Sequence, residues 1–241
     1  MQQATTAAVN FARAIGSIGH THAEYLLLRY CAATSLNHIP RLVDPDLVQG
    51  YAGQLWTALE EGARSLLGAT KITDLQLRVI GLPMREGGWG WVSAKQNLHL
   101  GHVGSAGDVA KYLNAAMATN PEMKHLMDQL RSSQSVIKSM MAINAAVAPH
   151  ARRVRFEPLD MRLIHVWPKQ KKLAKLYFNI LADDLEKGMA AVNRQAASWF
   201  ASHRLRGGMA WLNVIPKLPQ YQVSSELFRI MLGTATLVPV S

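Results

Sequence analysis

The sequence contains a single cysteine, Cys31, among its 241 residues. One cysteine cannot form an intrachain disulfide, so the fold has to depend on its core, and the composition is typical of a reducing compartment. Cys31 stands in the apolar stretch 25–33, where a small buried thiol is expected.

Long apolar runs are also missing. No run approaches the ~20 residues that a membrane-spanning helix needs, and the N-terminus lacks the apolar run of a signal peptide. We therefore expect a soluble protein that binds no membrane and lies inside the cell, in the cytoplasm or the nucleus. An organelle stays among the expected compartments, because several Ser and Thr but no acidic residue precede Glu24, as in transit peptides.

Motifs for nucleotides, metals and nucleophilic catalysis are absent too. The sequence has no Walker loop, G-x-G-x-x-G, G-x-S-x-G or H-E-x-x-H. The densest histidine pairs are His20 with His22 and His99 with His102, whereas a structural zinc site needs four convergent ligands, usually with cysteines. We expect no catalytic centre, no metal site and no cofactor. An enzyme of unrecognised type is a minor alternative, since a serine triad can assemble from distant residues.

The adjacent pair Asp183-Asp184 resembles the paired aspartates that hold two magnesium ions in phosphoryl transfer. The apolar residues around the pair are spaced for a helix, however. Neighbouring side chains on a helix diverge by roughly 100° and share one ion poorly. We therefore expect a solvated helix face on which Asp183 pairs with Lys187.

Positive charge and apolar residues are abundant. Hydrophobic residues make up 49% of the chain, and Lys plus Arg number 26 against 16 Asp plus Glu, a net charge of +10. Residues 1–150 hold 12 basic and 10 acidic side chains, and residues 151–241 hold 14 and 6. Such a surplus favours nucleic acid, anionic lipid or an acidic protein as partner.

Helical periodicity dominates the chain and predicts an all-α fold, a multi-helix bundle. Asp44-Pro45 is a good helix start, and Thr73 can cap a shorter helix. Helices are expected over residues 24–36, 45–67, 73–80, 93–120, 121–148, 169–187, 188–203, 209–214 and 226–232. The prolines in 149–168 predict a boundary between an N-terminal part, 1–148, and a basic C-terminal part, 149–241, with one continuous domain as the alternative.

A loop rich in glycine and tryptophan is expected at residues 81–91. Its central residues are Gly87, Gly88, Trp89, Gly90 and Trp91. The glycines permit unusual backbone angles, and the tryptophans are expected to pin the loop to the helical core. In the alternative interpretation, these tryptophans anchor a partner together with Trp199 and Trp211.

Two segments together resemble a known family. Residues 81–91, GLPMREGGWGW, followed by Ser93-Ala94, are similar to the LPxRxGGLG stretch downstream of the polymerase core in reverse transcriptases of non-LTR retrotransposons. Residues 207–216, GGMAWLNVIP, with residues 227–233, LFRIMLG, resemble the GAWLxxLP and EFRxxLRLRLG region that ends the same helical segment. The order and spacing agree, and residues 25–29 and 45–67 fit the helices before the first motif.

The chain also departs from this family. Trp89 replaces its usual Leu, and Arg229 alone remains of its repeated arginines near the end. The family's catalytic Tyr-Ala-Asp-Asp lies upstream of the Gly-Gly motif and has no counterpart here, because Ala182-Asp183-Asp184 lies downstream. No Cys/His zinc segment or nuclease follows the last motif. The resemblance implies the thumb and post-polymerase helices, which would grip template–primer or element RNA.

A basic cluster provides the candidate site. It comprises Arg152, Arg153, Arg155, Lys169, Lys171, Lys172 and Lys175. Arginine forks suit phosphates, and the nearby Phe156, Trp167, Tyr177 and Phe178 could stack on bases, although they equally fit a helical core.

The expected function combines this cluster with the resemblance. It is a non-catalytic, retroelement-derived helical module that binds RNA or an RNA–DNA hybrid. The alternatives are an interaction subunit of a larger ribonucleoprotein assembly, with a protein partner, and a reverse transcriptase fragment without activity of its own.

Overall fold

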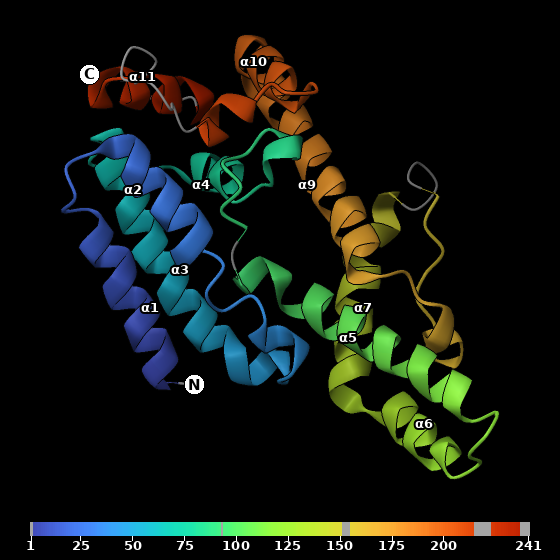
Figure 1. Ribbon diagram of the computed structural model, residues 1–241. Helices are drawn as coiled ribbons and strands as arrows, with labels where there is room; N and C mark the ends of the chain where they lie inside the picture. The colour runs from blue at the N-terminus through green and yellow to red at the C-terminus, as the bar shows by residue number, and fades with distance from the viewer. Residues whose placement is uncertain (1, 93, 151–154, 215–222, 237–241) are drawn as a thin grey trace. The chain divides into compact units, whose positions relative to one another are not determined.

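The structure, a computed structural model, describes residues 2–92, 94–150, 155–214 and 223–236. Within these ranges every regular element is a helix, so the expected all-α fold is confirmed (Figure 1). Two compact units form. Unit 1 comprises Met1–Ser35, Tyr51–Ser93 and Leu181–Ser241, and unit 2 comprises Leu36–Gly50 and Ala94–Ile180. Neither coincides with 1–148 or 149–241, because each is assembled from segments distant in sequence, and 149–168 lies inside unit 2.

Unit 1 is built from the following helices: α1 (Gln2–Ile15), α2 (Thr21–Leu27), a π-helical turn η1 (Leu28–Ala32), most of α3 (Pro45–Leu67), α4 (Asp74–Ile80), the 3₁₀ turn η3 (Met84–Glu86), the later part of α9 (Gln170–Val192), α10 (Arg194–Arg204), the 3₁₀ turn η6 (Ala210–Asn213) and α11 (Ser225–Thr236). The predicted helix over 45–67 is confirmed. Thr73 and Gln76 form a reciprocal capping box on α4, which confirms the start expected there.

The tryptophans of the glycine-rich loop fill the core of unit 1. Trp89 and Trp91 are both 0% exposed, and their rings meet edge to face at 5.2 Å. Tyr25 lies against both rings and donates its hydroxyl hydrogen to the Trp89 carbonyl oxygen at 2.7 Å. Phe228 of α11 contacts Tyr25 from a distant part of the sequence. Because both indoles are enclosed, they pin the loop to the core and cannot anchor a partner.

Glycine is required at three places in this loop for different reasons. Gly87 and Gly90 have φ values of +83° and +78°, which favour residues without a side chain. Gly88 has ordinary angles, but a Cβ atom there would collide with the carbonyl oxygens of Val79 and Leu82. The loop therefore packs its backbone directly on the end of α4.

Unit 2 is arranged around α5 (Ala94–Ala116). Its other elements are η2 (Ile39–Arg41), α6 (Met123–Ser132), α7 (Gln134–Val147), η4 (Ala148–His150), the 3₁₀ helix η5 (Met161–Val166) and the beginnings of α3 and α9. Helix α5 contacts η2, η5, α6 and α7. A Cβ atom at Gly101 would lie 3.2 Å from Pro40, and one at Gly104 would lie 2.5 Å from Gln170. These glycines allow neighbouring chain segments to approach the helix backbone closely.

The expected single helix over 121–148 is wrong. Ser133 has an extended conformation, with ψ of 113°, and separates α6 from α7. Its hydroxyl lies 3.2 Å from that of Ser135, a local polar contact of the kind that competes with helical backbone bonds. The break separates the apolar faces of the two helices, and Leu126 and Met141 are 45% and 61% exposed.

Other boundaries also differ from those expected. Helix α9 continues through Gly188 to Val192, and Asn193 then caps α10 by accepting from the Ala196 N–H at 3.1 Å. Cys31 is exposed rather than buried, on the π-helical turn η1. Residues 2–15, where no helix was expected, form α1. Among the described residues, no helix combines the length and apolar character needed to cross a bilayer.

Candidate nucleic-acid interface

The positive charge is concentrated in unit 2. This unit holds 14 basic and 7 acidic residues, a net charge of +7, whereas unit 1 holds 12 and 9, a net charge of +3. The excess that the sequence places after residue 150 therefore belongs largely to the unit that contains α5, η5 and the start of α9.

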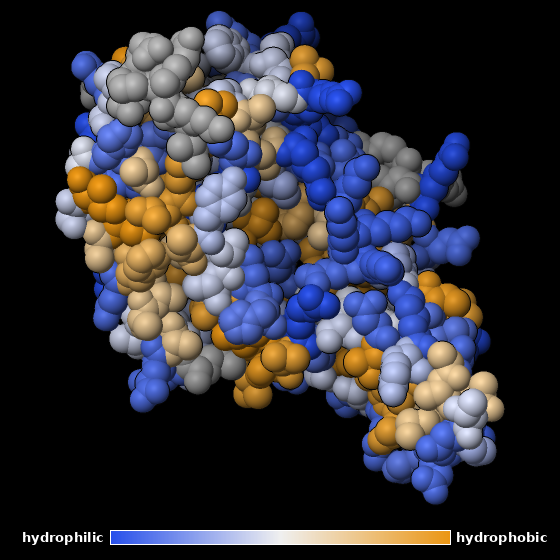
Figure 2. Space-filling view, viewed as in Figure 1, coloured by the Kyte–Doolittle hydropathy of each residue, from blue (hydrophilic) through white to orange (hydrophobic). Residues whose placement is uncertain are grey.

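Four predicted site residues gather at the beginning of α9. Lys169 immediately precedes the helix, and Lys171, Lys172 and Lys175 lie within its first turns. All four are exposed, and none forms an ion pair with a carboxylate of the described residues. Hydrophilic side chains cover the region of α9 in the space-filling view (Figure 2).

This arrangement opposes the electrostatics of the helix. The N-terminal end of a helix carries a partial positive charge, and a cation there loses about 0.3–1 kcal/mol of favourable interaction. Lys171 and Lys175 are also four residues apart on one face, where like charges repel by about 0.2–0.5 kcal/mol. The first turn of α9 has no acidic residue to offset this. A bound polyanion would relieve the repulsion.

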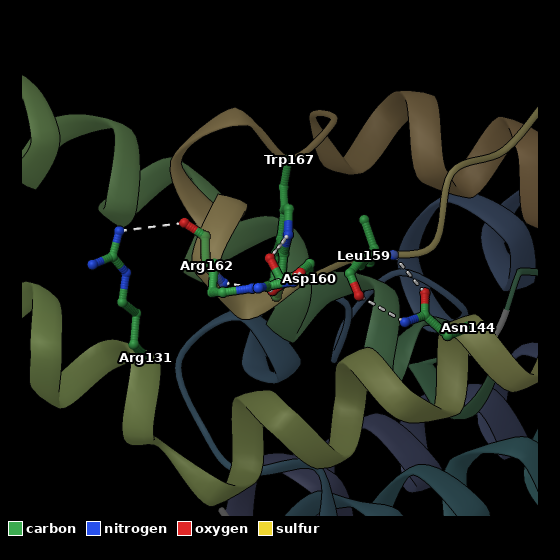
Figure 3. Close-up of polar contacts among 6 residues, drawn as sticks. All are labelled: Arg131, Asn144, Leu159, Asp160, Arg162 and Trp167. Atoms are coloured by element: carbon green, nitrogen blue, oxygen red, sulfur yellow. Dashed lines mark hydrogen bonds and ion pairs between the residues drawn. The ribbon is translucent and has the colours of Figure 1, made fainter.

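The chain before α9 is firmly positioned. Trp167 is 3% exposed, and its indole N–H donates to the Asp160 carbonyl oxygen at 2.9 Å (Figure 3). A Cβ atom at Gly107 of α5 would lie 3.4 Å from Trp167, so the indole rests close to the α5 backbone. Because Gln170 rests similarly on Gly104, the lysines start from a fixed point of unit 2.

The turn η5 in front of Trp167 is stabilised by polar contacts. Asp160 caps it by accepting from the Arg162 N–H at 2.8 Å and also pairs with the Arg162 side chain at 2.5 Å. The guanidinium of Arg162 holds the pKa of Asp160 below its usual value. Arg131 of α6 donates to the Arg162 carbonyl oxygen at 3.4 Å (Figure 3). These arginines therefore serve the local structure as well as the basic surface.

The predicted arginines are only partly described. Arg152 and Arg153 lie outside the described residues. Arg155 is exposed and has a φ of +50°, an uncommon conformation for a residue with a side chain. No contact among the described residues joins Arg155 to the four lysines, so among the described members of the predicted cluster the structure brings together the lysines alone.

The aromatic residues near the cluster belong mainly to the core. Trp167 is 3% exposed and Phe178 is 2% exposed, so neither ring can stack on a base. Burial raises the pKa of the Tyr177 hydroxyl, in keeping with its position edge to face with Phe178 at 5.4 Å. Charged rather than aromatic side chains therefore dominate the candidate surface, and of the four rings Phe156 and Tyr177 stay partly exposed.

The adjacent aspartates lie on α9, and Asp183 is paired with an arginine of α10. Asp183 accepts from Arg204 at 2.5 Å rather than pairing with Lys187, and Glu186 accepts from the same guanidinium at 2.6 Å. Partial burial would lower the pKa of Arg204, but these carboxylates outweigh it and raise the value. Within the described part of the chain, no three metal-ligating side chains converge. The expectation of a solvated face is wrong for Asp183, because α10 covers it.

The histidine pair on α5 contacts serines of α7. His99 Nδ1 lies 3.1 Å from the Ser139 hydroxyl, and His102 Nε2 lies 3.1 Å from that of Ser135. Burial lowers the pKa of both imidazoles. Neither ring has a hydrogen bond to a carboxylate in the described ranges, so the triad geometry is missing.

Three features of the site are not predicted from the sequence. These are the glycines of α5, the contact of Asn144 with the chain before η5, and the support of Trp167 by Asp160. The spacing Gly101, Gly104, Gly107 was the available signal, since glycine repeated inside a helix indicates close backbone approach.

Comparison with known proteins adds no relative: no family model matches the chain, and neither a curated protein nor a solved structure does.

Proposed function

We propose that the protein binds RNA or an RNA–DNA hybrid, without catalysis, through the lysines at the beginning of α9. The observation that carries the proposal is the gathering of Lys169, Lys171, Lys172 and Lys175 on an exposed helix start with no carboxylate partner among the described residues. Lysines and a helix N-terminus both attract phosphate groups.

Two further observations support this proposal. The unit that presents the lysines carries a net charge of +7, which favours association with a polyanion over long range. The start of α9 is also held by Trp167 and Gln170 against α5, so binding would require little ordering of the backbone.

The salt dependence of binding tests the proposal. We expect wild-type protein to bind a single-stranded RNA and an RNA–DNA hybrid at low salt and to weaken sharply as salt increases. Each neutralised phosphate contributes a slope of about −0.7 for single strands and about −0.9 for duplex in a double-logarithmic plot. Changing all four lysines to Gln should therefore lower the magnitude of the slope by about 3.

A matched variant separates local contacts from net charge. Arg64, Lys71, Arg78 and Arg206 are exposed in unit 1, and changing them to Gln removes the same charge. We expect this variant to keep most of the wild-type slope. Absence of RNA or hybrid binding at low salt, or equal loss in both variants, would contradict the proposal. Self-association of the protein without nucleic acid would favour the interaction subunit instead.

A further inference from the structure

Arg29 lies on the π-helical turn η1 of unit 1, against the glycine-rich loop. A Cβ atom at Gly90 would stand 2.8 Å from Arg29 Nε and 3.2 Å from Nη2. Gly90 is thus needed for the space that the guanidinium occupies as well as for its φ of +78°.

The guanidinium is held in place on its other sides. Its Nη1 donates to the Asn213 Oδ1 and lies 3.5 Å from the Tyr25 hydroxyl. Its Cζ lies 4.8 Å from the centroid of the Tyr30 ring, a cation–π contact. Tyr30 also donates its hydroxyl hydrogen to Asn213 Oδ1, at 2.8 Å. Four different residues therefore fix one arginine fork.

The chemistry of Asn213 follows from these contacts. Arginine can only donate hydrogen bonds, so the Asn213 atom that faces it must be the oxygen. The Nδ2 group of this exposed side chain then has two hydrogens and no partner among the described residues. Asn213 supplies a free donor beside a fixed cation.

The charge of Arg29 is not neutralised within the described part of the chain. No carboxylate pairs with it, and its Nε and Nη2 have no hydrogen-bond acceptor there. Glu24, on the preceding helix α2, is 5% exposed and accepts instead from the Gly19 N–H at 2.8 Å. Because a guanidinium binds carboxylate and phosphate oxygens strongly and in a bidentate geometry, a positioned fork without a carboxylate among the described residues is suited to an external anion.

We propose that Arg29, Tyr30 and Asn213 form a binding site for a phosphate monoester carried on a planar ring, the chemistry of a mononucleotide. Three donor groups lack an acceptor among the described residues, namely Nε and Nη2 of Arg29 and Nδ2 of Asn213. They match the three terminal oxygens of a phosphate better than the two of a carboxylate. The Tyr30 ring is 53% exposed and offers a surface for the planar group. The three residues belong to unit 1, whereas the lysines of α9 belong to unit 2.

Equilibrium titration of the full chain with adenosine 5′-monophosphate, inorganic phosphate, adenosine and acetate tests this proposal. We expect saturable binding of the monophosphate, weaker binding of inorganic phosphate, and none of adenosine or acetate. Arg29→Gln should weaken monophosphate binding at least tenfold. Arg29→Lys keeps the charge without the fork, so its affinity for the monophosphate should lie between those of the wild type and Arg29→Gln. Tyr30→Leu should weaken binding of the mononucleotide but leave binding of inorganic phosphate unchanged.

The controls keep the site distinct from the proposed RNA surface. Arg206→Gln removes an exposed charge of unit 1 and should bind the mononucleotide as wild type does. The variant lacking the four lysines of α9 should also bind the mononucleotide as the wild type does, even if it no longer binds RNA. Circular dichroism checks that each variant is folded. If Arg29→Gln is unfolded, the binding measured for Arg29→Lys and Tyr30→Leu decides whether the proposal holds. Wild-type protein that binds neither phosphate ligand, or that prefers acetate, overturns the proposal, as does unchanged binding by the folded Arg29 variants.

Discussion

The side chain of Asn144 holds the backbone of Leu159 by two hydrogen bonds, one in each direction. Its Nδ2 donates to the Leu159 carbonyl oxygen, and its Oδ1 accepts from the Leu159 N–H, both at 2.8 Å (Figure 3). Leu159 is only 6% exposed, so water cannot readily replace either bond. One amide thereby ties the chain before η5 to α7, and η5 in turn leads to the lysines of α9.

Replacement of Asn144 should destabilise unit 2 measurably. Asn144→Ala leaves the buried N–H and carbonyl of Leu159 unpaired. Each unpaired group costs about 1–3 kcal/mol of stability, and water that reaches the group reduces this cost. We expect a loss of about 2 kcal/mol in urea unfolding. Asn144→Asp keeps the acceptor but turns a carboxylate oxygen towards the Leu159 carbonyl oxygen, so it should lose no less at neutral pH. Asn114→Ala, on the exposed side of α5, is the control and should change stability by less than about 0.5 kcal/mol. Equal effects at the two positions would contradict this role.

Two glycines of unit 1 should respond to alanine in opposite directions. Gly88→Ala drives a methyl group into the backbone carbonyls of Val79 and Leu82, which cannot move as a flexible side chain could. We expect a loss of about 3 kcal/mol. Gly188 lies within α9 with open space around it, so Gly188→Ala should stabilise by up to about 1 kcal/mol through helix propensity. Thermal and urea unfolding of both variants check the signs.

Local signals in the sequence were sufficient for much of the fold. The start of α3 after Asp44 and the cap at Thr73 involve neighbours in the chain, so the sequence predicts them. No proline or glycine marks the break at Ser133, and Leu130 and Ile137 on either side of it keep a helical spacing, so local signals favour one continuous helix there. The lysines at the beginning of α9 were predicted as a group because they are adjacent in sequence.

Contacts between distant residues account for what the sequence could not predict. Asp183 was expected to pair within its helix, but the structure gives it Arg204, whose approach depends on how α10 packs. Arg29 and Asn213 lie at opposite ends of the chain, and neither is unusual in its local context. Such pairs become visible only when the helices have been placed, so charge and periodicity alone cannot identify them.

The histidines of α5 predict an acid-sensitive unit 2. Burial is the largest cause that lowers the pKa of His99 and His102, and Lys138 lowers that of His99 further, against the opposing effect of Asp46. A folded-state pKa below the usual value of about 6.5 means that the unfolded chain binds protons more readily. The full stabilisation is therefore present above about pH 6.5 and is lost as the pH falls below it towards the folded-state values.

Replacing both imidazoles should flatten this pH dependence. We expect the double variant His99→Gln, His102→Gln, whose amides can still bond to the serines of α7, to show a smaller fall in urea midpoint between pH 7 and pH 5 than wild type. His125→Gln, on an exposed face of α6, is the matched control and should leave the wild-type fall unchanged. An unaltered pH profile in the double variant would show that other groups cause the acid sensitivity.

Arg155 should show a conflict between stability and binding. Its φ of +50° costs roughly 1–2 kcal/mol for a residue with a side chain, whereas glycine adopts that angle freely but loses more entropy on folding. Arg155→Gly should therefore stabilise the protein, by about 0.5 kcal/mol net, while RNA binding at low salt weakens a few-fold because a predicted phosphate contact is gone. Arg155→Lys keeps both the charge and the strained angle and should resemble wild type in both measurements. A glycine variant that is less stable than wild type would mean that the side chain of Arg155 contributes contacts worth more than the strain of its backbone.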